Sequence, residues 1–239
     1  RNETIAVEIQ KIAFPKDGFW FYDYENGCIR NQNSSFFSIT GYRQRRAGRT
    51  VCSQPIIMQE EIGYLGILCR KIDGVMHFLM QAKIEPGNVN KIQISPTIQA
   101  TKSNFTRKHG GASPPYLEYF LNAGKYEIIV DQIQSEQSSR FYKKRNRNII
   151  LHVEEEIPVL PSHRWMTLGQ IKRLMREDNL VNMDTRTVLS CIPFSKLNLQ
   201  PLVLSGLSDC FRDKSLFRSV FLGDGQNKLP RIYQYINNW

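Results

Sequence analysis

The chain has 239 residues, of which 41% are hydrophobic and 23% charged, with a formal net charge of +10. These values are ordinary for a soluble globular protein with one good core or two small ones. No apolar run approaches the roughly 18 residues that span a bilayer, and the first ten residues lack the apolar core of a signal peptide. The five cysteines are scattered, odd in number and without a CxxC pair, which argues against a zinc site or a disulfide framework and fits a reducing cytoplasm.

The basic residues gather in three separate clusters. These are Arg43, Arg45, Arg46 and Arg49, then the segment from Lys102 to His109, then Arg140, Lys143, Lys144, Arg145 and Arg147. The net positive charge has three possible roles: it keeps the protein soluble, it binds nucleic acid, or it binds a small anionic ligand. Three clusters in an otherwise mixed chain do not make the single basic stripe expected for nucleic acid, so the pattern disfavours that partner.

The first third of the chain predicts short strands joined by turns. Residues 1–30 form a lead-in that turns at Asn26-Gly27, a hairpin-type dipeptide. A strand is expected over Ser35–Tyr42, followed by a loop or irregular edge over Arg43–Arg49. That basic segment is either an exposed face or a phosphate clamp, one that could reach a neighbouring subunit.

The centre of the chain predicts an antiparallel hairpin. Tyr64–Cys69 and Val75–Ile84 flank a tight turn at Asp73-Gly74. From His77 to Glu85 apolar and polar residues alternate, which is typical of a strand with one packed face.

A second alternating run follows over residues 92–101, after a turn at EPGN. The two runs each have a polar face, rich in amides and hydroxyls rather than in Lys and Glu, which is typical of the lining of a polar pocket. The members of these faces are Gln81, Lys83, Glu85, Gln93, Ser95, Thr97, Gln99 and Thr101. Because residues 86–117 contain several cations and no Asp or Glu, the region is able to hold an anionic ligand.

The second half of the chain adds helices and further strands. We expect a helix over Tyr116–Ala123, and strands over Tyr126–Gln132 and Ile149–Val153. A helix starts after Thr167 as N-cap, and a short helix over Thr185–Cys191 is capped by Asp184. Residues 196–239 are interpreted as a tail with a C-terminal helix that packs on a second module or subunit, after one module at 1–195. Many antiparallel strands with few helices predict the α+β class.

Five separated blocks of the sequence occur in the order found in one known family. They are NSSFFSITGYR, QPIIMQEEIGYLGIL, LMQAKIEPGNVNKIQISPTIQATKSNFTRKHGG, RWMTLGQIKRLM and VNMDTRTVLSCIPF. In these blocks the chain resembles the NDP-hexose 2,3-dehydratases. The resemblance implies a Nudix-like, mixed and largely antiparallel sheet flanked by helices. The metal box of Nudix hydrolases is missing, since no Glu has a Gly six positions before it, and no P-loop, GxGxxG or GxSxG motif occurs.

The resemblance also implies a reaction, the elimination of water from a nucleotide-linked 4-keto-6-deoxy sugar. The ketone at C4 acidifies the C3 proton, a base removes it, and the C2 hydroxyl leaves with help from an acid. No cofactor and no metal are required. The implied catalytic residues are Glu85 or His109, as base or acid, and Lys83, which holds the enolate oxygen or acts as an acid itself. The implied substrate-binding residues are Gln81, Asn88, Gln93, Thr97, Gln99, Lys102, Ser103, Asn104, Arg107, Tyr116 and Arg145.

Each role has a structural alternative. Lys83 and Glu85 could form an ordinary ion pair, His109 could cap a turn, and Tyr116 could be a packing residue at a helix start. In the resembled family two similar modules lie in tandem, whereas one set of motifs is found here, which predicts a homodimer. The expected ligand is a nucleotide-diphosphate sugar, dTDP-linked by analogy with the family.

Two rival functions stay open at this point. One is a nucleotide-sugar-binding subunit without catalytic activity. The other is a nucleic-acid-binding module built on the segment FYKKRNRN at residues 141–148, which would bind oligonucleotides with strong salt dependence.

Overall fold

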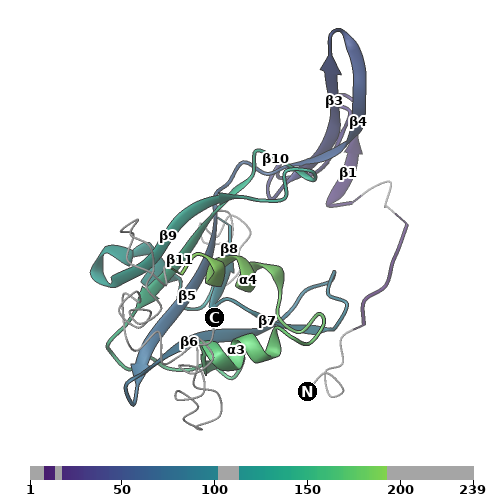
Figure 1. The fold of residues 1–239 in the computed structure, drawn as a ribbon. Helices are drawn as coiled ribbons and strands as arrows, with labels where there is room; N and C mark the ends of the chain where they lie inside the picture. Colours follow the sequence, from purple (N-terminus) through teal and green to yellow (C-terminus); the bar gives the residue numbers. More distant parts are fainter. Residues whose placement is uncertain (1–7, 14–17, 102–112, 193–239) are drawn as a thin grey trace.

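Two β-sheets make up most of the part of the chain that the computed structural model describes, which is residues 8–13, 18–101 and 113–192 (Figure 1). The larger sheet has seven strands and the smaller has five. Nearly all strand pairs are antiparallel, and the exceptions in these sheets are β11 on β5 and β10 on β4. With a few short helices beside the sheets, the chain has the α+β class that the sequence predicted.

The larger sheet forms the body of the molecule. Its main path runs β12-β6-β5-β11-β9, with β7 paired to β6 and β8 paired to β5. The strands are β5 (Gly63–Ile72), β6 (Val75–Ile84), β7 (Ile92–Ser95), β8 (Ile98–Ala100), β9 (Glu127–Ser135), β11 (Arg145–His152) and β12 (His163–Thr167). The hairpin of β5 and β6 turns at Asp73 and Gly74, which both have positive φ, as the sequence predicted.

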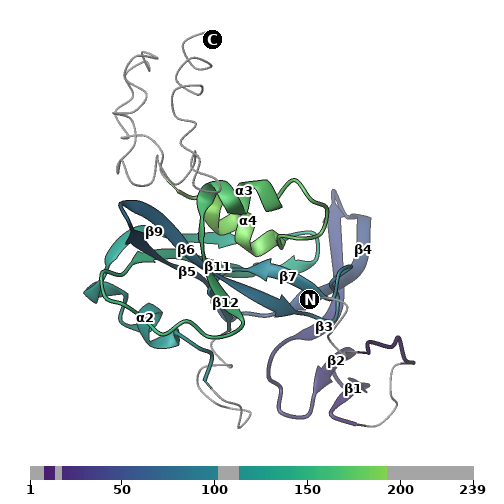
Figure 2. The same ribbon diagram turned by 90° about the horizontal axis from the view of Figure 1, so that it is seen from below.

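Helices cover both faces of this sheet (Figure 2). On one face lie α3 (Leu168–Leu174) and α4 (Met183–Ser190), over a core that includes Phe78 and Ile150. On the other face α2 (Leu117–Leu121) and the 3-10 helix η2 (Ala123–Lys125) cover a second core that includes Ile149. The alternation along β11 therefore sends successive residues into opposite cores. No helix among the described residues is long and apolar enough to cross a membrane.

Of the two predicted helix N-caps, one is confirmed and the other is corrected. The helix expected over Tyr116–Ala123 is the shorter α2, followed by η2. Thr167 caps α3 through a capping box with Gln170, as expected. The cap of α4 is Asn182, whose side chain accepts from the Thr185 backbone N–H at 2.8 Å, and not Asp184. Because Asn182 fills the capping position, the Asp184 carboxyl is left for other contacts.

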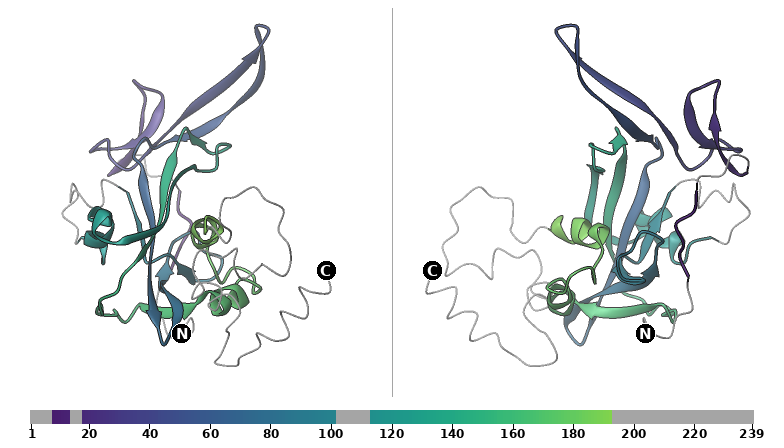
Figure 3. Two further views of the ribbon diagram at one scale, coloured as in Figure 1. Left: turned by 60° about the vertical axis from the view of Figure 1, so that its left-hand side comes forward. Right: turned by 90° about the vertical axis from the view of Figure 1, so that its right-hand side faces the viewer.

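The smaller sheet projects from the body as an arm. Its order is β1-β2-β3-β4-β10, with strands β1 (Trp20–Asp23), β2 (Cys28–Asn31), β3 (Ser38–Arg46), β4 (Arg49–Met58) and β10 (Phe141–Tyr142). The ends of β3 and β4 reach away from the rest of the molecule (Figure 3). The loop expected over Arg43–Arg49 is therefore wrong, because these residues belong to a long hairpin that turns at Ala47 and Gly48. The boundary at residue 195 stays a prediction, since residues 193–239 lie outside the described part of the chain.

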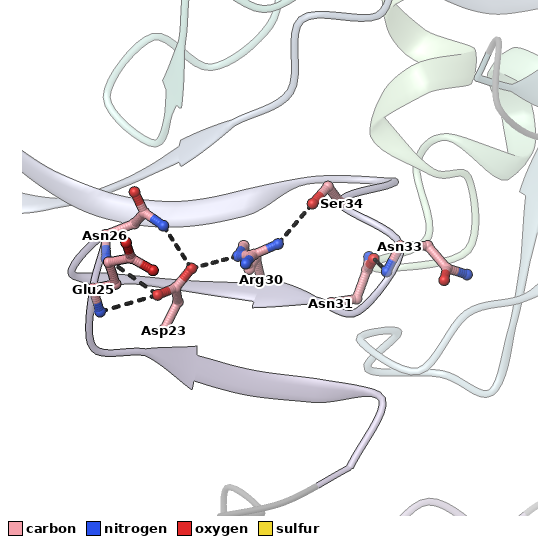
Figure 4. A network of polar contacts seen from close by, with 7 residues as sticks. All are labelled: Asp23, Glu25, Asn26, Arg30, Asn31, Asn33 and Ser34. Carbon is pink, nitrogen blue, oxygen red and sulfur yellow. Dashed lines mark hydrogen bonds and ion pairs between the residues drawn. The ribbon is translucent and has the colours of Figure 1, made fainter.

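The turn between β1 and β2 is organised by the Asp23 carboxylate (Figure 4). It accepts from the Asn26 side chain at 2.8 Å, from Arg30 Nε at 2.6 Å, and from the backbone N–H groups of Glu25 and Asn26 at 3.1 Å. These bonds to the charged form, led by the Asn26 side chain and followed by Arg30, lower the pKa of Asp23 to about 2.

We expect the Asp23→Asn variant to lose stability at pH 7 but to match the wild type near pH 2. The folded pKa lies below the unfolded one, about 3.9, so the stabilisation is present above the unfolded value and is lost as the pH falls towards about 2. Urea unfolding of the variant and of the wild type at both pH values measures the difference in the free energy of unfolding. The control is Glu25→Gln at an exposed residue. An equal loss for Asp23→Asn at both pH values would contradict the assignment.

A second stability prediction concerns the contact between β5 and α2. A Cβ at Gly66 would overlap the ring of Phe120, which is 1% exposed. We expect Gly66→Ala to lower the free energy of unfolding by about 1–3 kcal/mol, since the core has to move apart. Gly87→Ala is the matched control, because no atom lies within 4 Å of the new Cβ. Equal stability of the two variants in chemical denaturation would contradict the close contact between Gly66 and the Phe120 ring.

Candidate active site

The larger sheet forks at Thr97. β5 and β6 pair only from the turn to Cys69 and Phe78, after which β8 continues on β5 and β7 on β6. Thr97 lies between the two parted strands, where its hydroxyl accepts from the Leu68 N–H at 2.9 Å and donates to the Leu79 carbonyl. The single strand expected over residues 92–101 is therefore split at Pro96 and Thr97. Thr97 is buried and its hydroxyl bonds two backbone groups, which is a structural role. Its expected contact with sugar hydroxyls stays a prediction.

A polar network lies where β6, β8 and the start of α4 meet. Lys83 Nζ lies 3.0 Å from the Glu85 carboxylate and 3.1 Å from Gln99 Oε1. Gln99 Nε2 donates in turn to Asp184 Oδ2. Asn182 completes the set, because its Nδ2 donates to Ser95 Oγ at 3.1 Å and approaches Gln99 Oε1 at 3.4 Å. We call Lys83, Glu85, Gln99, Asn182 and Asp184 the Lys83–Asp184 network.

The orientation of the Gln99 amide is fixed by this network. Two donors, Lys83 and Asn182, face its oxygen, and one acceptor, Asp184, faces its nitrogen. If the amide were reversed, its NH₂ group would face two donors and its oxygen would face the Asp184 oxygen, so neither end would form a hydrogen bond. Gln99 therefore holds a cation and a carboxyl at opposite ends of one side chain.

Asp184 is the perturbed acid of the network. Burial raises the pKa of its carboxyl, the neighbouring Glu136 raises it further, and the Gln99 hydrogen bond opposes the shift. A carboxyl group that keeps its proton at higher pH than usual is suited to act as a general acid.

A cavity of about 300 Å³ opens beside Asp184, between α4, β9 and β11. Most of the residues that line it have polar side chains, including Gln134, Glu136, Asn146, Asn148 and Thr187, beside the apolar Leu65 and Met183. Asn146 Nδ2 donates to Glu136 Oε2 at 2.7 Å. The arrangement thus joins a cation, an acid of raised pKa and a small polar cavity.

The comparison with known protein families matches this part of the chain. A profile of the family described as NDP-hexose 2,3-dehydratase covers residues 1–192. The chain belongs to this family. The resemblance seen in its five sequence blocks is thereby confirmed.

Two curated relatives show how much of a family member is present. The chain is 52% identical over 191 residues to a dTDP-4-dehydro-6-deoxy-alpha-D-glucopyranose 2,3-dehydratase of Saccharopolyspora spinosa, covering 79% of this chain and 39% of that protein. A protein of the same name from Amycolatopsis orientalis is 39% identical over 216 residues, covering 84% of this chain and 44% of that one. The chain therefore spans about two-fifths of the length of these relatives.

Among solved structures, the similar chains are more distant. An ADP compounds hydrolase aligns with a TM-score of 0.43 and 10% identity, over 66% of this chain and 85% of that one. A C. elegans Ap4A hydrolase aligns with a TM-score of 0.35 and 11% identity, over 55% and 95%. Both TM-scores lie below 0.5, so the Nudix-like character of the scaffold stays a prediction.

Of the site residues expected for this dehydratase family, three meet in the network. They are Lys83, Glu85 and Gln99. Lys83 and Glu85 form the ion pair that was the structural alternative to their catalytic roles, and those roles stay predictions. Five others, Lys102, Ser103, Asn104, Arg107 and His109, lie outside the described residues, and their roles stay predictions.

The remaining expected residues lie apart from the network. Tyr116 is structural, because its hydroxyl donates to the Pro158 carbonyl at 2.9 Å and accepts from the Leu160 N–H at 3.0 Å. Gln93 lines a different groove of about 500 Å³, which is largely apolar and includes Met80 and Met166. By strand alternation Arg145 lies on the opposite face of β11 from Asn146 and Asn148. For Arg145 the expected contact with the diphosphate stays a prediction.

Gln81 and Asn88 also lie outside the contacts that define the network. Gln81 is half-buried on β6 opposite Ser95. Asn88 lies in the turn after β6, where its backbone N–H donates to the Glu85 carbonyl at 3.0 Å. For both residues the expected contact with substrate stays a prediction.

The segment 141–148 does not offer a continuous basic surface. Lys144 is buried and donates to the backbone carbonyl of Glu61. Arg147 is bonded to both oxygens of Asp131 at 2.7 and 2.6 Å. Two cations are thus engaged within the body, which disfavours the nucleic-acid hypothesis. Among the described residues, no three His, Cys, Asp or Glu side chains gather as a metal site.

Proposed function

We propose that this chain carries the dehydration site of an NDP-4-keto-6-deoxyhexose 2,3-dehydratase, centred on the Lys83–Asp184 network. The observation that carries the proposal is that Gln99 links Lys83 to Asp184, an acid whose pKa is raised, at the edge of a polar cavity. Elimination beside a ketone needs a base, an acid and a cation for the enolate. The network contains one group suited to each role.

In the proposed reaction, Glu85 removes the proton from C3 and the C–H electrons form the C3–C4 enolate. Lys83, which lies 3.0 Å from Glu85, stabilises the negative charge on the C4 oxygen. The enolate then re-forms the ketone, a double bond forms between C2 and C3, and the C2 hydroxyl leaves as water with a proton from Asp184. The enol product tautomerises to the 3,4-diketo-2,6-dideoxy sugar. Electrons balance within the substrate, so the steps include no redox cofactor.

The proposed substrate is a dTDP-linked sugar, because both curated relatives are named for dTDP-4-dehydro-6-deoxyglucopyranose. The chain, mixed with that compound in deuterated water, is followed by NMR. We expect loss of the C2 oxygen, with deuterium entering C2 of the product as the enol tautomerises, and exchange of the C3 proton in substrate that has not yet eliminated. A protein that binds the nucleotide sugar but produces neither change would overturn the proposal and favour the non-catalytic binding function.

We further propose that two copies of the chain pair through the arm. The segment 38–58 holds four exposed arginines and no Asp or Glu, and none of the four is ion-paired within the described residues. An isolated two-stranded ribbon is only marginally stable in water. A second surface would stabilise it.

An acidic surface on the body complements this arm. Glu154, Glu155 and Glu156 are exposed one after another, and Glu118 lies near them. The closeness is reflected in Tyr126, whose pKa is raised first by burial, then by Glu155 and Glu118. Because arm and acidic surface lie on different parts of one chain, two copies can exchange these contacts reciprocally.

We expect the wild-type chain to elute as a dimer in low salt, and its arm variant to elute as a monomer. The arm variant replaces four residues by Glu, namely Arg43, Arg45, Arg46 and Arg49. The control variant makes the same change at four exposed cations near α3, namely Arg164, Lys172, Arg173 and Arg176. Light scattering after gel filtration gives the mass. A monomeric wild type, or a dimer that survives reversal of the arm, would contradict the pairing.

A further inference from the structure

The small cavity beside Asp184 contains an acceptor without a donor. The side chain of Asn148 is completely buried and lines this cavity. Its Nδ2 faces two backbone carbonyls, Asn146 O at 3.3 Å and Gln132 O at 3.5 Å. Its Oδ1 has no hydrogen-bond partner among the described residues. Buried polar atoms in native proteins nearly always have a hydrogen-bond partner, so an unpaired one indicates that a partner is missing.

The amide orientation of Asn148 is determined by its surroundings. Both groups near Nδ2 are carbonyl oxygens, which can only accept. Turning the amide over would bring Oδ1 against them and leave a donor unpaired instead. The free atom is therefore an oxygen, and what it lacks is an O–H or N–H group.

The other polar atoms of the cavity include further acceptors. Asp184 and Glu136 present carboxyl oxygens, and Glu136 already takes the Nδ2 donor of Asn146. No Lys or Arg is among the described residues that line the cavity. A diphosphate would meet two acidic groups and no cation from these residues, whereas a ligand rich in hydroxyl groups would supply the missing donors.

The size of the cavity also favours a sugar ring as the ligand. Its volume, about 300 Å³, lies at the lower end of the range of small-molecule sites. That space suits one sugar ring and not a whole nucleotide sugar. The nucleotide and its diphosphate must then lie outside the cavity.

We propose that this cavity is the sugar subsite, in which Asn148 Oδ1 accepts a hydrogen bond from a hydroxyl of the hexose. The inference rests on the proposed function, since it places the ring of that substrate against Asp184. It adds an orientation, with the sugar inside and the diphosphate outside. It also makes Asn148 a specificity-determining residue, because a ring without a hydroxyl at that point would leave its oxygen unpaired.

The test compares the affinities of dTDP and of dTDP-glucose, measured by calorimetry on the full chain. dTDP-glucose has no ketone and undergoes no elimination, so binding of the sugar is measured apart from turnover. We expect the wild type to bind dTDP-glucose more tightly than dTDP. We expect Asn148→Leu to reduce this gain about tenfold while the dTDP affinity is unchanged, since one hydrogen bond to the sugar is lost. Asn33→Leu, the same change at an exposed residue of the arm, is the control.

The outcomes separate this inference from the proposed function. An unchanged gain in Asn148→Leu, or a wild type that binds both compounds equally, would overturn the subsite. Equal losses for both compounds would also overturn it, because Asn148 would then only support the fold. If the tenfold effect appears while the NMR assay shows no dehydration, the sugar subsite stands and the catalytic proposal fails.

Discussion

Replacing Asp184 by Asn is expected to slow water elimination about 10²- to 10⁴-fold while deuterium still enters C3. The amide keeps the size of the carboxyl and keeps an oxygen for the Gln99 donor. It has no proton of comparable acidity to give to the leaving hydroxyl. Because the proton at C3 is removed by a different residue, exchange should continue. NMR in deuterated water measures the two rates in one experiment, with exposed Asp178→Asn as the control.

The same variant should be more stable than the wild type at neutral pH. Burial raises the pKa of Asp184 in the folded state, so the folded chain binds this proton more strongly than the unfolded one. Stability from this group is therefore present at low pH and falls as the pH rises above the unfolded value. The Asp184→Asn variant has no carboxyl to ionise and avoids this loss. Thermal melting should show a gain at pH 7 that shrinks towards pH 4; a loss of stability at pH 7 would argue against a functional strain at this position.

Replacing Glu85 by Gln is expected to remove both signals, elimination and C3 exchange, by about 10²- to 10⁴-fold. The carboxylate lies 3.0 Å from Lys83 Nζ, so the base and the cation for the enolate are adjacent. Gln has nearly the same shape but does not accept a proton from carbon at neutral pH. The change also leaves Lys83 without its ion pair, although its contact with Gln99 at 3.1 Å is retained.

The pair of variants is more informative than either one alone. Glu85→Gln should block the first step, and Asp184→Asn only the second. Exposed Glu60→Gln is the control for the first variant. Exchange that persists at the wild-type rate in Glu85→Gln would remove this residue from the role of base, and His109 would then be the next residue to replace.

The strands were predictable where the sequence pattern had one physical cause. The alternation from His77 to Ile84 predicted a strand, and it is β6 in the structure. The single packed face was wrong, because Phe78 and Leu79 lie in the two different cores on opposite faces of the sheet. The start of α3 at Thr167 was predictable because its cap is a local interaction. The split between β7 and β8 was not predictable from alternation, since it depends on how far β5 and β6 have separated. Within the arm, only Arg43–Arg49 was interpreted as a loop or irregular edge. A hairpin exposed to solvent on both faces has no apolar alternation to mark its strands.

The site was predictable only where its members share one stretch of sequence. Lys83 on β6, Glu85 just after it and Gln99 on β8 lie within one short stretch of sequence, and the polar faces of the predicted strands marked them together. The role of Asp184 in the site was missed because Asp184 was predicted to cap α4, whereas Asn182, two residues earlier, is the cap. Asn148 escaped because it lies in a segment dominated by basic residues. Its signal was nevertheless present, because Asn146 and Asn148 share with the buried Ile150 one face of β11.

Two pockets among the described residues of the body offer contrasting places for a sugar. The cavity beside Asp184 is small and rich in acceptors, whereas the groove beside His163 and Met166 is larger and mostly apolar. The Lys83–Asp184 network touches only the first of them through its acid. The location of the bound sugar therefore decides whether the network is the catalytic centre.

The most direct measurement is a crystal structure of the Asp184→Asn variant with the dTDP-4-keto-6-deoxy sugar bound. Because this variant should retain the substrate without dehydrating it, the ring can be observed in place. We predict the C2 hydroxyl within hydrogen-bond distance, roughly 2.7–3.2 Å, of the side chain at position 184, with the C4 oxygen towards Lys83. A ring found in the groove beside His163 and Met166, away from the network, would contradict the assignment of this site.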